Sequence, residues 1–376
     1  TAVAGNGYWI DTTSNACTIT LPASASNGDE IMFADYARNW GTNGIVIDSN
    51  GLNYQTQDDT YTVEYGTDGT ALHIVYSGAT NGWIPTLDKT VKAIGNSEGV
   101  FAFGNNGSYL GMSNLVSDAG VVSTDVAAVG TAREGAAACE YGGNKGIFGF
   151  GYDASGNLSR TNLVTNEGVL GTDVTGVGTA RYYLAACSYG GGTGIFGFGS
   201  TGTHLAETNL VSISGVVATD TSGVGTARYN LAACEYGGDK GIFGFGSTGS
   251  VTGVTNLVSN TGVVASDVAA VGTARHGLAA CSYGYDKGIF GFGTTGTAVG
   301  MTNLVSNAGV VATDVTAVGT ARYYLAACEY GYDKGIFGYG SAYSSVTNLV
   351  TNAGVVGTDV TGVGTARWRI GACSFN

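Results

Sequence analysis

The chain has 376 residues, with 65 Gly, 2 Pro and only 11% charged residues, where about 25% is ordinary. The shortage of proline excludes collagen, the shortage of Glu, Lys and Leu excludes a coiled coil, and 22 Tyr and 13 Phe supply enough apolar surface to exclude disorder. A formal net charge of −13 repels nucleic-acid phosphates and anionic bilayers, and no run reaches the ~18 apolar residues of a membrane span. The excess of Gly, Thr, Val and Tyr indicates strands and tight turns, so we expect an all-β protein that binds no nucleic acid and inserts into no membrane.

Residues 1–88 form the first predicted unit. Its alternating apolar runs lie at 17–21, 31–34, 45–47, 61–65 and 72–76. Several short strands at regular spacing are typical of a small β-sandwich or β-roll. Three of the four Trp, at Trp9, Trp40 and Trp83, fall in this unit. Residues 89–98 are expected to be a linker.

A repeat fills the chain from residue 99 to 376. The tetrapeptide Gly-Thr-Ala-Arg recurs six times, 45 to 48 residues apart, and ends at Arg133, Arg181, Arg228, Arg275, Arg322 and Arg367. Each repeat has four short apolar runs separated by Gly, Asn, Asp and Ser, which predicts four strands. Four strands in this period are typical of a β-propeller blade, whereas a helical solenoid would need apolar spacing of 3.6 residues.

The strand count predicts how the ring of blades closes. The first strand has no convincing copy before Gly99, and a spare first strand stands at the C-terminus, residues 370–375. The residue after the repeat Cys alternates as Glu140, Ser188, Glu235, Ser282, Glu329 and Ser374, and an alternation closes on itself only in an even ring. We therefore expect a six-bladed β-propeller closed by the C-terminal strand. The period of two places both Phe of each Ile-Phe-Gly-Phe-Gly strand on one face, where they can enter the groove left by a neighbouring blade's glycines.

Each repeat also has a fixed order of residues: an Arg before a small-residue strand, a Tyr-Gly turn, and then Ile-Phe-Gly-Phe-Gly. This order resembles a degenerate kelch repeat. The kelch diglycine is replaced by Gly-Phe-Gly and the later Trp is absent, so the resemblance implies a kelch-like propeller and no particular kelch partner.

Several motifs stand out in the first unit: residues 5–13, Leu21-Pro22, Gly28-Asp29, Asp35-Tyr36 and Gly82-Trp83. Together they resemble a small domain common in tailed-phage virion proteins, especially tail fibres and appendages. The resemblance implies a particle-bound attachment protein whose first unit contacts other virion proteins and forms a homo-oligomer, with a trimer as one candidate.

Metal and disulfide chemistry is not expected. One cysteine per blade, at Cys139, Cys187, Cys234, Cys281, Cys328 and Cys373, places equivalent residues beyond the ~7 Å Cα limit for a disulfide, and Cys17 has no partner. We expect seven free thiols, the six in the repeat being buried. No Cys-x-x-Cys motif exists, and the three His lie in different units, so neither a zinc set nor a triad is assembled. We expect no metal, no cofactor and no enzyme.

Two charged sets recur in phase with the repeat. An Asp precedes each repeat Arg by eight residues, at Asp125, Asp173, Asp220, Asp267, Asp314 and Asp359. A pair present in every blade is expected to be architectural rather than an acid and base. Glu140, Glu235 and Glu329 are either a three-fold set that holds a cation near the axis or partners of donors between blades, and the second interpretation is favoured.

The residues just after the repeat Arg differ between blades. On propeller topology they share one face with the variable loops that follow the second strands. The candidate ligand-binding residues are Tyr182, Tyr183, Tyr229, His276, Tyr323, Tyr324, Trp368 and Arg369. Aromatic rings offer flat apolar area with a polar edge, which suits sugars and protein hot spots alike. Drift on an idle surface and burial between blades are the alternatives.

We therefore expect a phage virion attachment protein, located on the virion or outside the cell, whose propeller meets a host surface glycan or protein, with a glycan favoured. A structural decoration protein without a ligand is one alternative. A secreted bacterial lectin, adhesin or polysaccharide-acting enzyme is another.

Overall fold

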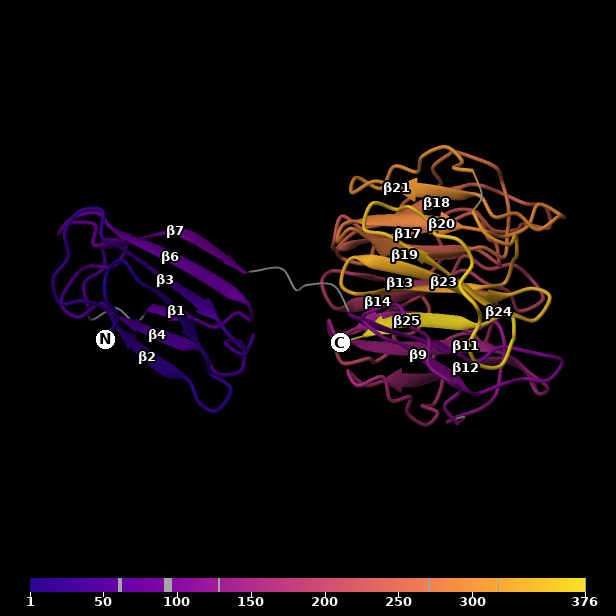
Figure 1. Ribbon diagram of the computed structural model, residues 1–376, viewed down its shortest axis with the longest axis horizontal. Coiled ribbons are helices and arrows are strands. Elements are labelled where there is room, and N and C mark those ends of the chain that lie inside the picture. The colour runs from indigo at the N-terminus through magenta and orange to yellow at the C-terminus, as the bar shows by residue number, and fades with distance from the viewer. Residues whose placement is uncertain (60–62, 91–96, 128, 270, 317, 376) are drawn as a thin grey trace. The chain divides into compact units, whose positions relative to one another are not determined.

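The computed structural model describes residues 1–59, 63–90, 97–127, 129–269, 271–316 and 318–375 (Figure 1). Within these residues every regular element is a β-strand and none is a helix, so the expectation of an all-β chain is confirmed. Contacts divide the chain into two compact units, Thr1–Ala93 and Ile94–Asn376. The predicted linker, 89–98, falls largely on residues 91–96, which lie outside the described residues.

The N-terminal unit, Thr1–Ala93, has two sheets that share one core. One sheet has the order β1-β3-β6-β7 and the other β2-β4-β5. The strands are β1 (Gly7–Ile10), β2 (Cys17–Thr20), β3 (Glu30–Asp35), β4 (Ile45–Asp48), β5 (Val63–Tyr65), β6 (Thr70–Tyr76) and β7 (Trp83–Thr90). Buried and more exposed side chains alternate along these strands. Ile31 and Phe33 of the first sheet are thus buried in the same cluster as Ile45 and Ile47 of the second, together with Trp40.

Two of these strands, β1 and β7, are absent from the apolar runs found in the sequence. β1 is an edge strand that pairs in parallel with β3. β7 contains Pro85, which lies opposite Ile74 at a register shift in the β6–β7 ladder. Proline cannot donate to a ladder, which explains why the sequence pattern misses this strand. The predicted run 61–65 is described only from Val63, since residues 61 and 62 lie outside the described residues.

The C-terminal unit, Ile94–Asn376, contains six three-stranded antiparallel sheets in its described residues. Five sheets are continuous in sequence: β10 (Ala137–Tyr141), β11 (Lys145–Asp153) and β12 (Gly156–Val164); β13 (Ala185–Tyr189), β14 (Thr193–Gly197) and β15 (Thr208–Val211); β16 (Ala232–Tyr236), β17 (Lys240–Gly244) and β18 (Thr255–Val258); β19 (Ala279–Tyr283), β20 (Lys287–Gly291) and β21 (Thr302–Val305); β22 (Ala326–Tyr330), β23 (Lys334–Gly340) and β24 (Ser344–Val350).

The sixth sheet joins the two ends of the unit. Its order is β25-β8-β9, so β8 (Glu98–Ala102) lies between β9 (Ser113–Val116) and the C-terminal strand β25 (Gly371–Phe375). Gly371 lies opposite Ala102, and Phe375 lies opposite Glu98. The predicted pairing of the spare terminal strand with the strand that begins near Gly99 is therefore confirmed.

The fourth apolar run of each repeat does not form a strand, so the expectation of four strands per repeat is wrong. The run returns beside the third strand through two isolated bridges, such as Val116 with Val122 and Ser113 with Val126. Between these bridges the outer segment has one residue more than the third strand, and such an extra residue interrupts a ladder as a β-bulge. The bulge brings Asp125 to Asn114, whose Nδ2 donates to Asp125 Oδ1 over 2.9 Å.

The six sheets form a closed, propeller-like cycle of contacts. Their first strands touch in the order β25, β10, β13, β16, β19, β22 and again β25. The glycines of the second strands make this approach possible: a Cβ on Gly244 would lie 2.7 Å from Phe290 of the next sheet, and one on Gly338 would lie 2.8 Å from Phe101. The expectation that a neighbour's Phe enters the glycine groove is confirmed for the first Phe of five motifs, whereas Phe148 lies against Gly371 of the first strand β25 because β8 has Ala102 in place of the glycine.

The second Phe of each motif departs from the predicted strand. Phe150, Phe198 and their four equivalents have φ between 62° and 66°, a conformation that side chains other than glycine adopt rarely. It directs the carbonyl of Phe198 to Arg181 Nε, which donates to it over 2.8 Å. The next residue, Gly199, donates to the carbonyl of Arg228 in the following sheet over 3.0 Å. This Phe therefore ties the strand end to two repeat arginines.

Candidate functional site

At one end of the ring of sheets, six residues form a closed cycle of backbone hydrogen bonds. Each amide donates to the carbonyl of its counterpart in the preceding sheet over 2.6–3.0 Å, and each φ lies between 54° and 64°. The six residues, which we call the axial ring, are Gly135, Tyr183, Asn230, Gly277, Tyr324 and Arg369. Because four of them are not glycine, their left-handed backbone is held by the surrounding structure, and it gathers their side chains over the axis.

Tyr183 and Tyr324 stack on one another across the axial ring. Their ring centroids are 5.9 Å apart and their planes differ by 9°, although the two residues come from sheets three places apart. Two glycines of the axial ring make room for them: a Cβ on Gly135 would lie 2.6 Å from Tyr183, and one on Gly277 would lie 2.9 Å from Tyr324. The glycine that precedes each of these tyrosines in the ring thus allows the stack to form.

An ion pair lies beside this stack. Arg369 Nη1 donates to Glu134 Oε1 over 2.5 Å, and the guanidinium carbon lies 5.1 Å and 5.2 Å from the ring centroids of Tyr183 and Tyr324, within reach of a cation–π attraction. Burial lowers the pKa of Arg369, but Tyr183 and Glu134 raise that pKa by more, so the guanidinium stays charged. Burial, and then the charge of Glu134, raise the pKa of Tyr183, which keeps its phenol neutral.

Further aromatic side chains extend this stack into one continuous cluster. Neighbouring ring centroids lie 4.6–6.4 Å apart, and the rings are Tyr109, Tyr152, Tyr182, Tyr183, His204, Tyr229, His276, Tyr323, Tyr324, Tyr343 and Trp368. We call these rings, with Glu134 and Arg369, the aromatic cluster. The rings are half-buried except for Tyr343, which is 48% exposed. The cluster therefore presents ring edges and faces to solvent from a fixed base.

Four polar atoms of the aromatic cluster are buried without a hydrogen-bond partner in the protein: Glu134 Oε2, His276 Nδ1, Trp368 Nε1 and Arg369 Nε. Glu134 is only 5% exposed. Burial lowers the pKa of His276, so its imidazole is neutral near pH 7. Buried polar groups are nearly always paired, so these four atoms are exceptions within the described residues.

All eight candidate ligand-binding residues lie in the aromatic cluster. Tyr183, Tyr324 and Arg369 belong to the axial ring, and the other five surround it. The candidate set omitted Glu134, Tyr109, Tyr152, His204 and Tyr343. In the sequence, only their positions mark these residues. Glu134 lies directly after a repeat Arg, and the other four lie at or after the end of a second strand.

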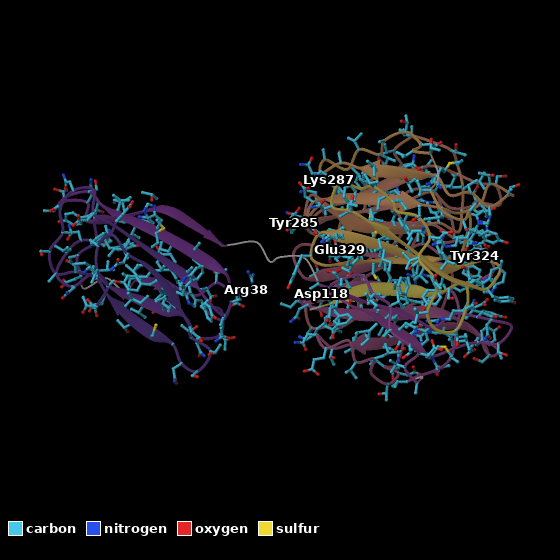
Figure 2. All side chains as sticks on the ribbon, in the orientation of Figure 1. Arg38, Asp118, Tyr285, Lys287, Tyr324 and Glu329 are labelled. Carbon is cyan, nitrogen blue, oxygen red and sulfur yellow. The ribbon has the colours of Figure 1, made fainter. Side chains whose placement is uncertain are left out.

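The cluster faces away from the point where the chain enters the C-terminal unit. Figure 2 shows Tyr324 at one end of this unit and Tyr285, Lys287 and Glu329 at the other. Ser97, the first described residue of the unit, accepts a hydrogen bond of 2.8 Å from the amide of Gly331, close to Glu329. Ser97 therefore lies toward the end of the C-terminal unit opposite to the aromatic cluster.

The repeat arginines are buried apart from the cluster, and the repeat aspartates lie at more exposed positions beside them. In one example, Arg228 donates to the carbonyls of Phe245 and Thr226 over 2.9 Å and 3.0 Å, and to Asn256 Oδ1 over 2.7 Å. Asp267 accepts from Asn256 Nδ2 over 2.8 Å and from Thr226 Oγ1 over 2.5 Å. Burial lowers the pKa of Arg228 to about 10, against the opposing effect of Asp267, so the buried guanidinium remains charged at neutral pH.

The same bonds recur around the ring. The residues concerned are Arg133, Arg181, Arg275, Arg322 and Arg367, with Asp173, Asp220, Asp314, Asp359 and Asp125. One departure is Arg133, whose Nε has no partner in the protein. Because each arginine is at most 1% exposed, these side chains face no ligand at the surface.

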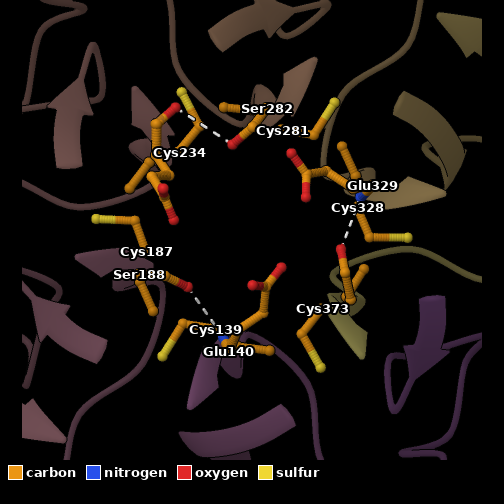
Figure 3. A pocket seen from close by; sticks show the side chains of 18 residues that line it. Cys139, Glu140, Cys187, Ser188, Cys234, Cys281, Ser282, Cys328, Glu329 and Cys373 are labelled. Atoms are coloured by element: carbon orange, nitrogen blue, oxygen red, sulfur yellow. Dashed lines mark hydrogen bonds between the residues drawn. The ribbon is translucent and has the colours of Figure 1, made fainter. Parts of the chain in front are cut away.

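The opposite end of the axis holds the repeat cysteines and the alternating Glu and Ser residues (Figure 3). They line a cavity of about 60 Å³. Each Ser bonds the backbone of the Glu in the preceding sheet: Ser188 Oγ accepts from Glu140 N, Ser374 Oγ accepts from Glu329 N, and Ser282 Oγ donates to the carbonyl of Glu235, over 2.8–3.2 Å. The three Ser hydroxyls thus link neighbouring sheets through backbone atoms. Among the described residues, no group of three or more His, Cys, Asp or Glu side chains is placed to hold a metal ion.

All seven cysteines are free thiols, as expected from the sequence. The six in the repeat are buried. Each repeat Cys packs where the next sheet has a glycine: a Cβ on Gly241 would lie 2.5 Å from Cys187 Sγ. Burial raises the pKa of Cys187 well above its ordinary value, which disfavours the thiolate that reacts as a nucleophile.

No protein-family model matches the chain, and no curated protein matches it. In the part of the chain that the structure describes, no helix is long and apolar enough to span a membrane.

Proposed function

We propose that residues 99–376 are a six-bladed, kelch-like β-propeller whose aromatic cluster binds a host surface glycan. The cyclic order of the six first strands supports the propeller. Further support comes from the axial ring and from the pairing of β25 with β8, because both close the unit after six sheets.

The observation that carries glycan binding is the aromatic cluster with its unpartnered polar atoms. Flat rings with a polar edge suit the apolar face of a sugar. In this proposal a bound sugar opens access to the buried, unpartnered Glu134 Oε2 and Trp368 Nε1, which then supply an acceptor and a donor to its hydroxyls. A binding site with mostly apolar walls and a few fixed polar groups has the usual composition for ligand recognition.

The wider role that we propose is attachment of a phage virion to its host. In this proposal the N-terminal unit is a small β-sandwich that contacts other virion proteins and further copies of this chain. Trp9, Tyr36 and Met32 support such contacts, since they are 77%, 66% and 51% exposed on or beside β1 and β3, and exposed apolar groups of this size mark interaction surfaces. A decoration protein without ligand and a secreted lectin are the competing roles.

We propose binding without catalysis. Glycoside hydrolysis ordinarily needs two carboxyl groups on either side of the scissile bond. Glu134 Oε1 already accepts hydrogen bonds from Arg369 and Tyr183, an arrangement that suits a fixed acceptor better than a group exchanging protons.

The proposal is tested by screening the full chain against a glycan array. Tyr343→Ala and Trp368→Ala should each weaken binding of any glycan retained, with little change in melting temperature for Tyr343→Ala because that side chain is 48% exposed. Tyr285→Ala and Tyr332→Ala are matched controls, since these tyrosines are 57% and 43% exposed and follow first strands at the opposite face. Absence of any glycan binding, or equal losses in the controls, would favour the decoration role.

A further inference from the structure

The face that carries the aromatic cluster repeats after three sheets rather than one. Along the axial ring the residues run Gly135, Tyr183, Asn230 and then Gly277, Tyr324, Arg369. At the preceding positions Tyr182 and Tyr323 are identical, Tyr229 and Trp368 are both aromatic, and Glu134 and His276 differ. The segment Arg-Tyr-Tyr-Leu-Ala-Ala-Cys occurs identically at 181–187 and 322–328. The ring of six sheets thus has a pseudo-two-fold axis on this face.

The spacing of the rings follows this pseudo-two-fold axis, although the planes of Tyr183 and Tyr229 differ by 28° and those of Tyr324 and Trp368 by 67°. Tyr182 and Tyr183 meet edge to face at 4.6 Å, and Tyr323 and Tyr324 meet edge to face at 4.9 Å. On the next sheet, Tyr183 lies 6.4 Å from Tyr229, and Tyr324 lies 5.5 Å from Trp368.

One aromatic side chain from the loop region after the second strand completes each half of the aromatic cluster. His204 lies 4.6 Å from Tyr229, and Tyr343 lies 5.9 Å from Trp368. Four pairs of rings therefore correspond across the axis.

We infer that each chain carries two equivalent saccharide subsites, which meet at the stack of Tyr183 on Tyr324. Arc 1 consists of Tyr182, Tyr183, His204 and Tyr229, and arc 2 of Tyr323, Tyr324, Tyr343 and Trp368. This inference rests on the proposed glycan binding. It adds that the ligand has a repeated unit. Two similar surfaces recognise two similar parts of one saccharide chain or two separate short saccharides.

The charges around the arcs select a neutral saccharide. Arg369 already donates to Glu134 and stacks on Trp368, 4.5 Å from its ring. Glu134 and Asp153 both act on Tyr109, whose pKa is raised first by burial and then by these carboxylates. An anionic sugar would meet these negative charges and a guanidinium whose charge is already paired, so uronate and sialate residues should be disfavoured.

The stoichiometry of disaccharide binding to the full chain tests this inference. The probes are cellobiose, maltose, lactose and N,N′-diacetylchitobiose, with digalacturonic acid as the anionic comparison, measured by titration calorimetry. We expect one or more neutral probes to bind at two sites per chain and digalacturonic acid to bind at least tenfold more weakly. His204→Ala and Tyr343→Ala remove equivalent outer rings from arc 1 and arc 2, so each variant is the matched control of the other.

Each of these two variants should retain one site of nearly unchanged affinity, and the double variant should retain none. Tyr229→Trp makes arc 1 more like arc 2, and it should keep two sites. One site per chain, lost completely in either single variant, would overturn the two-subsite inference while leaving glycan binding intact. Stronger binding of digalacturonic acid would overturn the neutral class. Failure of every probe, together with an empty glycan array, would instead overturn the proposed function on which the inference rests.

Discussion

Removing the side chain of Phe375 tests whether the terminal strand stabilises the ring as strongly as the other first strands do. Phe375 is fully buried in a cluster with Val100, Phe103 and Phe148. A buried Phe→Ala change costs about 3–5 kcal/mol, from lost transfer free energy and the cavity that remains. In a unit of this size each kcal/mol lowers the melting temperature by about 2–4 °C, so we expect a fall of at least roughly 6 °C.

The repeat supplies two comparisons for this experiment. The other five sheets have a buried Tyr in the same position, at Tyr141, Tyr189, Tyr236, Tyr283 and Tyr330, so Phe375→Tyr should be nearly neutral. Tyr236→Ala, in a sheet that is continuous in sequence, should cost about as much as Phe375→Ala. Urea unfolding of the full chain followed by circular dichroism measures all three. A loss below about 1 kcal/mol for Phe375→Ala beside a full loss for Tyr236→Ala would refute closure by the terminal strand.

Three further outcomes follow from the packing and the charges. Thiol titration of the native protein should detect at most Cys17, the half-exposed cysteine, whereas the denatured protein should show all seven thiols; ready reaction of the repeat cysteines in the native state would contradict their burial. Burial raises the pKa of each repeat Asp, but hydrogen bonds from Thr and Asn lower that pKa by more, to below 3.8. These carboxylates therefore stabilise the folded state above pH 3.8, and the urea midpoint should fall as the pH drops through the folded-state pKa values, less steeply in Asp267→Asn. Finally, Gly371→Ala should destabilise the ring because its Cβ would lie 3.0 Å from Phe148. Gly371 lies opposite Ala102, so adding Ala102→Gly in the same chain should restore stability. Urea unfolding of the double variant measures this coupling.

Local patterns in the sequence predict the sheets well, because the repeat imposes the same strand six times. The Gly-Ile-Phe-Gly run predicts the second strand and its glycine groove, and the spare strand at 370–375 predicts the partner of β8. The same logic fails for the fourth run, where Val-Val-x-Thr-Asp has strand composition but the bulge before Asp125 is set by hydrogen bonds to Asn114 and Thr365. Thr365 lies 240 residues away in the chain, so no local pattern records it.

The candidate site was predictable as a set of residues but not as an arrangement. Tyr183 and Tyr324 are visible in the sequence as variable residues after the repeat Arg. Their stack depends on a left-handed backbone at both positions and on the absence of a side chain at Gly135 and Gly277, and none of these is a propensity of tyrosine. The equivalence of residues 181–187 and 322–328 was the available signal, and comparison between blades three apart would have found it.

The side-chain patterns on the two faces of the ring have different periods. On the face with Glu140 and Ser188 the pattern returns after two sheets, because each Ser bonds the backbone of a Glu beside it. On the face with Tyr183 and Tyr324 the pattern returns after three, because the stack joins opposite sheets. Six is the smallest number divisible by both two and three. A ring that gained or lost one repeat would bring two Ser or two Glu together at one face and leave a tyrosine without its partner at the other.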